Sequence, residues 1–156
     1  MKSSRRFRAA AFTLIEAMVA IGIFGIIAAA AIAGMIRMNT NAALCRLQTG
    51  ASTVAQGQID LCLSDSPFNP QYSEVPPELT IGTTNAGTST APTIAVYTDP
   101  STSISIMGWM TTTVANTNST ENGSTLYVYQ VTVTVSYYYR NRLYSVTLST
   151  MRCSDT

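Results

Sequence analysis

Glu16 is the residue of this chain whose type and position most clearly point to chemistry. It stands in front of twenty residues, 17–36, that carry no charge. Four cations precede it within the first eight residues: Lys2, Arg5, Arg6 and Arg8. An apolar run of about 20 residues can span a bilayer as a helix, and a charge at the centre of such a helix costs about 2.5–3.5 kcal/mol. An acid at the edge of this run therefore suggests a partner of opposite charge.

The residues around Glu16 follow a specific order. A basic segment ends at the small residue Ala11, the block Phe12-Thr13-Leu14-Ile15-Glu16 follows, and the apolar run comes next. This order resembles the N-terminus of the type IV pilin superfamily, which comprises pilins, minor pilins and the pseudopilins of type II secretion. The resemblance covers about residues 5–37. It implies a prepilin leader at 1–11, cleavage between Ala11 and Phe12 by a prepilin peptidase, and N-methylation of Phe12.

Ala11 departs from the glycine that usually precedes the cut in this family. Alanine is the next-smallest residue, so the same bond is the expected cleavage site, cut more slowly.

The expected role of Glu16 follows from its place in the first turn of a helix, where the helix dipole favours a negative charge. Cleavage would create a new amino group on Phe12, about one turn away. In a filament, this amine of one subunit can meet Glu16 of another in a medium of low dielectric constant, where a paired charge is tolerated and an unpaired one is expensive. The resemblance implies this role, in which Glu16 sets the axial register of the assembling subunits.

A second interpretation treats the N-terminal segment as a conventional signal peptide. Ala31-Ile32-Ala33 offers a small-x-small cleavage site. A cut after Ala33 would release an exported soluble binding domain. The apolar run is long for a signal peptide and Glu16 would interrupt it, so this interpretation is the alternative.

The three cysteines fit an oxidising compartment with one disulfide and one spare thiol. Cys45 and Cys62 lie seventeen positions apart on the expected helix, about 25 Å, which is too far for a disulfide. Cys153 is therefore one partner if a bond forms. Cys62–Cys153 is the favoured pair, with Cys45 as the spare, and unpaired buried thiols are the other possibility.

Composition argues against several classes of function. Removing residues 1–11 leaves five cations and eight anions, so bulk charge does not indicate a nucleic-acid binder. Histidine, the commonest general base and metal ligand, is absent. The acids Asp65, Glu74 and Glu78 match no calcium-loop spacing. We expect no enzyme activity, no metal and no cofactor.

The expected fold is α+β, a long N-terminal helix followed by an antiparallel sheet of about four strands. The helix should run from Phe12 to about Leu63, about 78 Å. Residues 12–37 form its transmembrane half, and 38–64 form an amphipathic continuation packed on the sheet. The expected apolar stripe of that second half is Leu44, Leu47, Ala51, Val54 and Leu61.

Residues 65–156 should form an exported head domain that begins with a proline-rich loop at 65–91. Within the loop, one short strand is expected at 79–83. Further strands are expected at 93–98, 104–115, 126–139 and 142–152, with Asn122-Gly123 as a hairpin turn.

In the last two expected strands, apolar and hydroxyl-bearing side chains alternate strictly, and this alternation predicts the register in which the strands pair. A two-residue loop at Arg140-Asn141 places apolar residues opposite apolar ones and hydroxyls opposite hydroxyls. The expected pairs are Tyr137–Tyr144, Val135–Val146, Val133–Leu148, Ser136–Ser145 and Thr134–Thr147.

The sequence thus predicts a structural subunit of a type IV pilus-like filament or of a type II secretion pseudopilus. Its expected partners are copies of itself, other pilins, the prepilin peptidase and the assembly machinery. The basic leader favours a precursor in the inner membrane with a periplasmic head, later part of an extracellular pilus or a periplasmic pseudopilus. The different pilins share this N-terminal block, so it does not distinguish motility, adhesion, DNA uptake and export.

Overall fold

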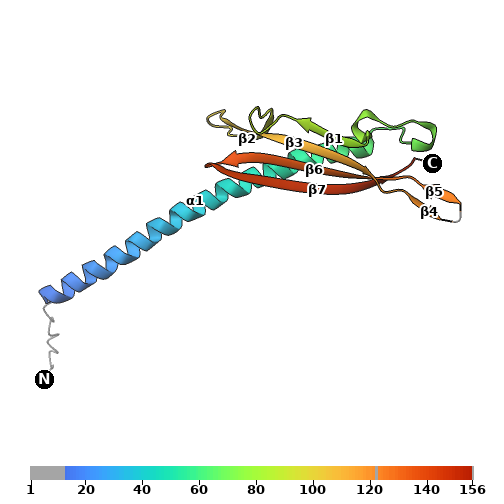
Figure 1. Ribbon diagram of the computed structural model, residues 1–156. Helices are drawn as coiled ribbons and strands as arrows, with labels where there is room; N and C mark the ends of the chain where they lie inside the picture. Colours follow the sequence, from blue (N-terminus) through green and yellow to red (C-terminus); the bar gives the residue numbers. More distant parts are fainter. Residues whose placement is uncertain (1–12, 122, 156) are drawn as a thin grey trace, which may run out of the picture. The chain divides into compact units, whose positions relative to one another are not determined.

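The computed structural model of the chain describes residues 13–121 and 123–155. It contains a 51-residue helix, α1 (Leu14–Ser64), and two short 3-10 helices, η1 (Pro70–Tyr72) and η2 (Pro77–Leu79) (Figure 1). The strands are β1 (Gly82–Ala86), β2 (Ile94–Thr98), β3 (Ser105–Asn116), β4 (Ser119–Glu121), β5 (Ser124–Leu126), β6 (Val128–Tyr139) and β7 (Arg142–Cys153). The expected α+β fold is confirmed. The chain divides inside α1, between Ala43 and Leu44, into two compact units.

The described part of the first unit is the N-terminal part of α1. Its residues are rich in alanine and isoleucine and include no proline, so nothing in the sequence breaks the helix. This part is long and apolar enough to cross a membrane, and its most apolar 18-residue window has no buried residue. Its apolar surface is therefore available to lipid or to other helices.

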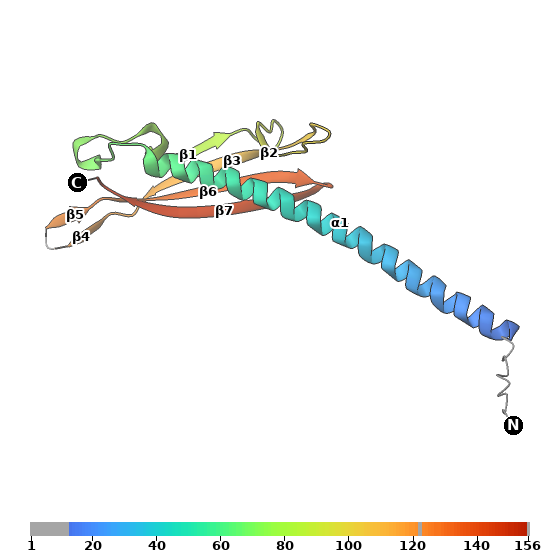
Figure 2. The ribbon, with the colours of Figure 1, turned by 180° about the vertical axis from the view of Figure 1, so that it is seen from behind.

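The second unit packs the rest of α1 against one face of a sheet (Figure 2). The buried helix residues are Leu47, Ala51, Ala55, Ile59 and Cys62. They pack with Val131, Val133, Val135 and Tyr137 of β6 in one apolar core. The two alanines leave room for the helix to approach the sheet closely, and Gly50 brings it close to the backbone of Val96 on β2.

The expected apolar stripe is confirmed at Leu47 and Ala51 and wrong at Leu61, which is 56% exposed. Cys62 takes the buried place at the end of the stripe. Consecutive helix residues point about 100° apart, so burying Cys62 turns Leu61 towards solvent.

The main sheet has five strands, one more than the approximate number expected. Its order is β1-β3-β6-β7, with β2 also paired to β3, and every pairing is antiparallel. β1 corresponds to the short strand that was expected at 79–83 within the loop 65–91. It starts at Gly82 rather than at Leu79, because the 3-10 turn that begins at Pro77 includes Leu79.

The β6–β7 hairpin is confirmed in every expected pair, from Tyr137–Tyr144 to Val133–Leu148. Its loop residues Arg140 and Asn141 both have positive φ, 49° and 60°. Two such residues in succession match the backbone twist that a two-residue hairpin loop requires.

The expected strand at 126–139 is interrupted at Tyr127. Leu126 belongs to β5, which pairs with β4 in a separate two-stranded sheet. The side chain of Asn118 accepts a hydrogen bond from the Val128 backbone N–H at 3.0 Å and marks the point where β6 begins.

Candidate functional site

Thr13 organises the first turn of α1 around Glu16. The Thr13 carbonyl oxygen accepts hydrogen bonds from the backbone N–H groups of Glu16, at 3.1 Å, and Ala17, at 3.2 Å. The Thr13 hydroxyl accepts a further bond from the Glu16 N–H and donates to Glu16 Oε2, both at 3.4 Å. Thr13 is therefore the N-cap residue, and it holds the Glu16 carboxylate beside the positive end of the helix dipole.

This role of Thr13 was not predicted, although the sequence contains a signal for it. Ser or Thr followed three residues later by Glu is the capping-box pattern that marks helix starts. Thr13-Leu14-Ile15-Glu16 fits it.

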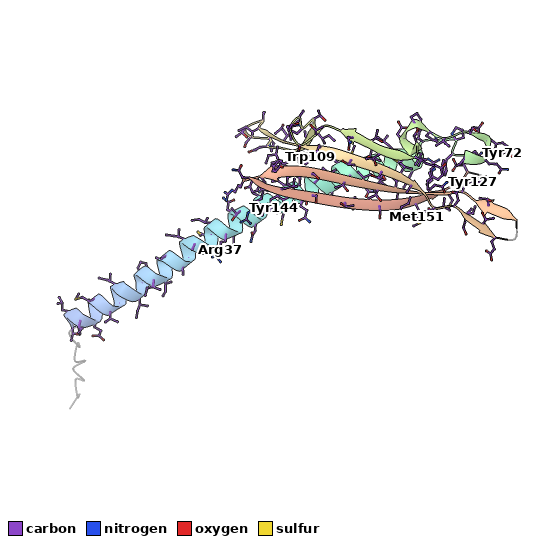
Figure 3. All side chains as sticks on the ribbon, viewed as in Figure 1. Arg37, Tyr72, Trp109, Tyr127, Tyr144 and Met151 are labelled. Carbon is purple, nitrogen blue, oxygen red and sulfur yellow. The ribbon has the colours of Figure 1, made fainter. Side chains whose placement is uncertain are left out.

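Glu16 is exposed and stands at the front of an uncharged helix surface. The next charged residue along α1 is Arg37 (Figure 3), and the rise between the two is about 31 Å. That distance matches the hydrocarbon thickness of a typical bilayer, about 30 Å. Between them, large apolar side chains such as Ile21 and Phe24, each 72% exposed, face outwards. The helix thus presents one carboxylate at one edge of a membrane-sized apolar surface.

The predicted processing residues Ala11 and Phe12 lie outside the described residues, so the geometry of the scissile bond is not part of this structure. Thr13 is the first residue that the structure describes.

The three cysteines are free, and the expected Cys62–Cys153 disulfide is not formed. Cys62 is buried on α1, whereas Cys153 is exposed at the end of β7. Successive residues of a strand point to opposite faces. Arg152 points to the helix side, where it contacts the Cys62 carbonyl, so Cys153 points to the other side. Cys45, the expected spare, is exposed. Burial raises the pKa of the Cys62 thiol, which keeps it protonated and unreactive.

A polar cluster that was not predicted from the sequence surrounds Arg152 at the C-terminal end of α1. This side chain is almost fully buried. It donates from Nη1 to the carbonyl oxygens of Cys62, at 2.8 Å, and of Asp65, and from Nη2 to Asp155 Oδ2 at 2.9 Å. Asp155 Oδ2 also accepts from the Phe68 N–H at 2.9 Å, and this bond is the main reason why the pKa of Asp155 lies below its usual value.

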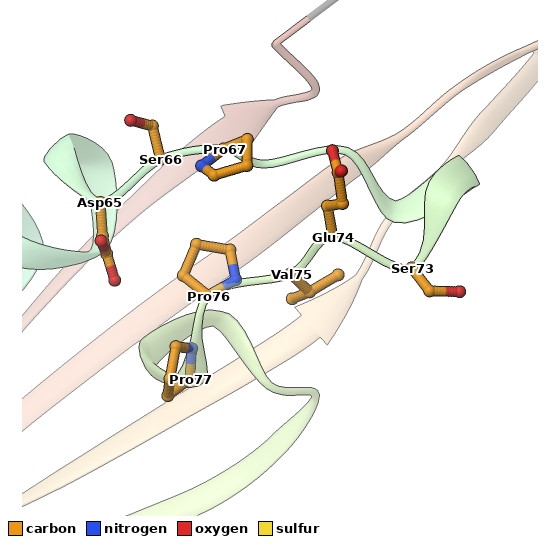
Figure 4. A pocket seen from close by; sticks show the side chains of 8 residues that line it. All are labelled: Asp65, Ser66, Pro67, Ser73, Glu74, Val75, Pro76 and Pro77. Carbon is orange, nitrogen blue, oxygen red and sulfur yellow. The ribbon is translucent and has the colours of Figure 1, made fainter.

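The acids considered for calcium do not form a site. Asp65 and Glu74 lie at opposite ends of a pocket of about 300 Å³ (Figure 4). Glu78 lines a different pocket, beside Gln58. Within residues 13–121 and 123–155, no group of three or more potential ligands is placed to hold a metal ion.

Comparison with known protein families identifies a methylation motif at the N-terminal end. The model of the prokaryotic N-terminal methylation motif matches residues 6–32. This motif is the signature of type IV pilins and pseudopilins, and the match includes the expected cleavage bond and Glu16. No curated protein and no solved structure gives a significant match to the chain.

Proposed function

We propose that this chain, which carries the N-terminal methylation motif of type IV pilin and pseudopilin precursors, is a structural subunit of a pilus-like filament or of a type II secretion pseudopilus. The precursor resides in the inner membrane with its head in the periplasm. It is cut between Ala11 and Phe12, methylated on Phe12, and then assembled with copies of itself or with other pilins into the periplasmic pseudopilus or extracellular pilus.

The observation that carries this proposal is the combination of the matched motif with the exposed helix. The first unit offers an uncharged helical surface about 31 Å long that nothing in the described chain covers. In the precursor, lipid would cover it. In a filament, the same surfaces of neighbouring subunits would cover one another.

The proposed role of Glu16 follows from the energetics of moving the helix from lipid into a filament. Lipid tails are as apolar as leucine, so moving an apolar helix from lipid into a bundle gives little hydrophobic gain and depends on close packing. Packing of similar apolar surfaces discriminates poorly between axial positions. A carboxylate that is paired in one register and unpaired in the others discriminates strongly, because an unpaired charge in a low dielectric is expensive.

The Thr13 cap supports this role, because it orients the carboxylate towards the start of the helix before any partner arrives. The Thr13 hydroxyl bond to Glu16 Oε2 leaves Oε1 free of side-chain hydrogen bonds among the described residues and open to an incoming amine. A pre-positioned acceptor loses less conformational freedom on binding than a mobile one.

The mass of the mature N-terminus tests the proposal. The native chain should be recovered from membranes of cells that contain a prepilin peptidase, and its N-terminal peptide measured by mass spectrometry. We expect a start at Phe12 with one added methyl group. A start at Gly34 would instead establish the signal-peptide alternative, and an intact leader would show an uncleaved membrane protein.

Two controls sharpen this experiment. Cells without the peptidase should give only the uncut chain. The variant Ala11→Gly should raise the processed fraction if the small residue before the cut limits the rate.

A further inference from the structure

The sheet of the second unit has an open face that carries no charge. Figure 2 views the sheet from the side that α1 covers, and Figure 1 views the opposite, open face. The five strands are fully described, and their only charged residues are Arg142 and Arg152. Arg152 is buried on the helix side, and Arg142 lies at the hairpin end. A face without charge offers no ionic contacts, so a ligand of this face would be recognised by hydrogen bonds and apolar contacts.

Hydroxyl groups cover the middle of this face in two rows across the sheet. The first row is Thr83, Thr113, Thr132 and Ser149, and the second is Asn85, Thr111, Thr134 and Thr147. Thr134 and Thr147 share a hydrogen bond between their hydroxyls at 3.0 Å. Thr83 and Thr113 do the same at 3.3 Å, and Thr111 donates to Asn85 at 2.9 Å.

These rows form a pre-ordered hydrogen-bonding surface. Neighbouring strands lie about 4.8 Å apart, and residues on one face of a strand follow each other at about 6.8 Å. Threonine is β-branched and stiff about its first side-chain torsion. Each hydroxyl has one donor and two acceptor positions, so pairing within a row leaves capacity for a ligand. Little side-chain entropy remains to be lost on binding.

An aromatic pair adjoins the hydroxyl rows towards the β6–β7 hairpin. The rings of Trp109 on β3 and Tyr138 on β6 have centroids 5.6 Å apart and planes tilted by 44°. Tyr138 is 51% exposed, and Leu143 opposite it is 57% exposed. Figure 3 labels Trp109 towards one end of the sheet and Met151 towards the other. Tyr137, by contrast, is buried and stacks on Tyr144. Of the three consecutive tyrosines at 137–139, only Tyr138 therefore faces the open side.

We propose that the open face binds a neutral polysaccharide chain of β-linked hexoses. Such a sugar offers hydroxyl groups around its edge and apolar C–H faces above and below the ring. The threonine rows suit the hydroxyl groups, and the Trp109–Tyr138 pair suits a C–H face. The lack of charge fits an uncharged ligand and disfavours nucleic acid, which requires cations.

A crystalline surface such as ice is the other ligand that a regular hydroxyl array could take. Adjacent strands of a sheet are rotated relative to one another by about 20–25°. Over four strands, this twist prevents the hydroxyl rows from matching a flat crystal lattice. A single flexible chain can follow that twist. The proposal concerns the second unit only and stands or falls independently of filament assembly.

Calorimetry on the full-length chain in lipid nanodiscs tests this proposal, with soluble mixed-linkage β-glucan as the probe and empty nanodiscs as the blank. We expect saturable binding. Trp109→Ala should weaken it about tenfold, and Thr134→Val with Thr147→Val about fivefold. Thr150→Val changes the same side chain on the helix-facing side of β7 and should leave binding unchanged.

Several outcomes would overturn the proposal. These are no binding of β-glucan, equal binding by all variants, or tighter binding of the acidic polymer polygalacturonate. Inhibition of ice recrystallisation without β-glucan binding would also do so, in favour of a lattice ligand. Matching unfolding curves of the variants would show that any loss reflects contacts rather than misfolding. The N-terminal mass result does not bear on any of these readings.

Discussion

Arg152 of β7 donates a hydrogen bond to the carbonyl oxygen of Cys62 in the last turn of α1, and the two residues are ninety positions apart in the chain. The last four carbonyls of a helix have no partner within it, and a cation is favourable there because of the helix dipole. This bond ties the last strand of the sheet to the end of the helix. It makes the connection that the Cys62–Cys153 disulfide was expected to make.

Replacing Arg152 should destabilise the second unit strongly. Arg152→Ala leaves the carbonyls of Cys62 and Asp65 without their donor and Asp155 without its cation. We expect the free energy of unfolding to fall by about 3 kcal/mol. Urea unfolding, followed by the fluorescence of Trp109, the single tryptophan, measures it.

The matched control is Arg140→Ala in the exposed hairpin loop, where the guanidinium lies 5.5 Å from the Tyr139 ring centroid. Removing it should lower the free energy of unfolding by less than about 1 kcal/mol. Equal losses for the two arginine variants would contradict the importance of the buried contacts.

Acid should weaken the same region through Asp155. The Phe68 N–H and, to a smaller extent, Arg152 lower the pKa of this carboxyl in the folded state. Its contribution to stability is therefore fully present above the unfolded-state pKa, about 3.9, and is lost as pH falls through the lower folded-state value. Asp155→Asn should lower the urea midpoint at neutral pH and converge with the native chain in acid.

A series of urea midpoints between about pH 7 and pH 2.5 measures this difference. Glu121→Gln, in the exposed β4–β5 hairpin, serves as the carboxylate control. If the difference in urea midpoint between Asp155→Asn and the native chain stayed constant down to the lowest pH, Asp155 would not be the group whose titration destabilises the fold.

Thiol labelling should separate the three cysteines. Cys45 and Cys153 are exposed and Cys62 is buried, and burial also raises the pKa of the Cys62 thiol. Maleimide should therefore add two labels to the folded chain and a third only in urea, without any reductant. Whole-protein mass counts the labels. A chain that accepts one label in urea until it is reduced would contain a disulfide after all.

Two helix glycines should respond in opposite directions to the same substitution. A Cβ on Gly50 would lie 2.1 Å from the Val96 carbonyl oxygen, whereas a Cβ on Gly57 would meet nothing within 4 Å. Gly57→Ala should raise the free energy of unfolding by about 0.5–1 kcal/mol through helix propensity. Gly50→Ala should lower it by about 2 kcal/mol or more, because the clash is with backbone. Urea unfolding of both variants measures the contrast, and stabilisation by Gly50→Ala would refute the close approach.

The elements that the sequence predicts well are those set by local patterns. The β6–β7 hairpin follows from strict alternation on both strands and from a loop of two residues, so that a slip of one residue would misplace every side chain. The start of the helix carries a local signal too, in Thr13 and Glu16. The match to the methylation motif rests on residues 6–32, which are contiguous.

The features that the sequence predicts poorly depend on contacts between distant residues. Leu61 and Cys62 are both apolar neighbours on one helix, and only the position of the sheet decides which is buried. From the sequence alone, Arg152 resembles an ordinary surface cation at the end of a strand. Its role is visible only once the fold places the end of α1 beside it. The orientation of Cys153 depends on a distant contact in the same way, because the face to which it points depends on where Arg152 is anchored.

The charge of Glu16, rather than its size, should control assembly. Glu16→Gln keeps the shape of the side chain and its ability to accept from the Thr13 hydroxyl, but it removes the charge that would pair with the new amine of Phe12. Without the pair, the preferred register loses its advantage over others. We expect the yield of sheared filaments to fall by about tenfold, equivalent to about 1.4 kcal/mol per subunit, while the membrane-bound precursor remains processed and methylated.

Glu74→Gln, an exposed carboxylate of the head, is the control for charge loss and should leave the yield unchanged. Thr13→Val tests the cap separately. It removes the hydroxyl that holds Glu16 and should reduce the yield less than Glu16→Gln, since the charge remains and only its pre-positioning is lost. Filaments of native yield from Glu16→Gln would show that helix packing alone sets the register.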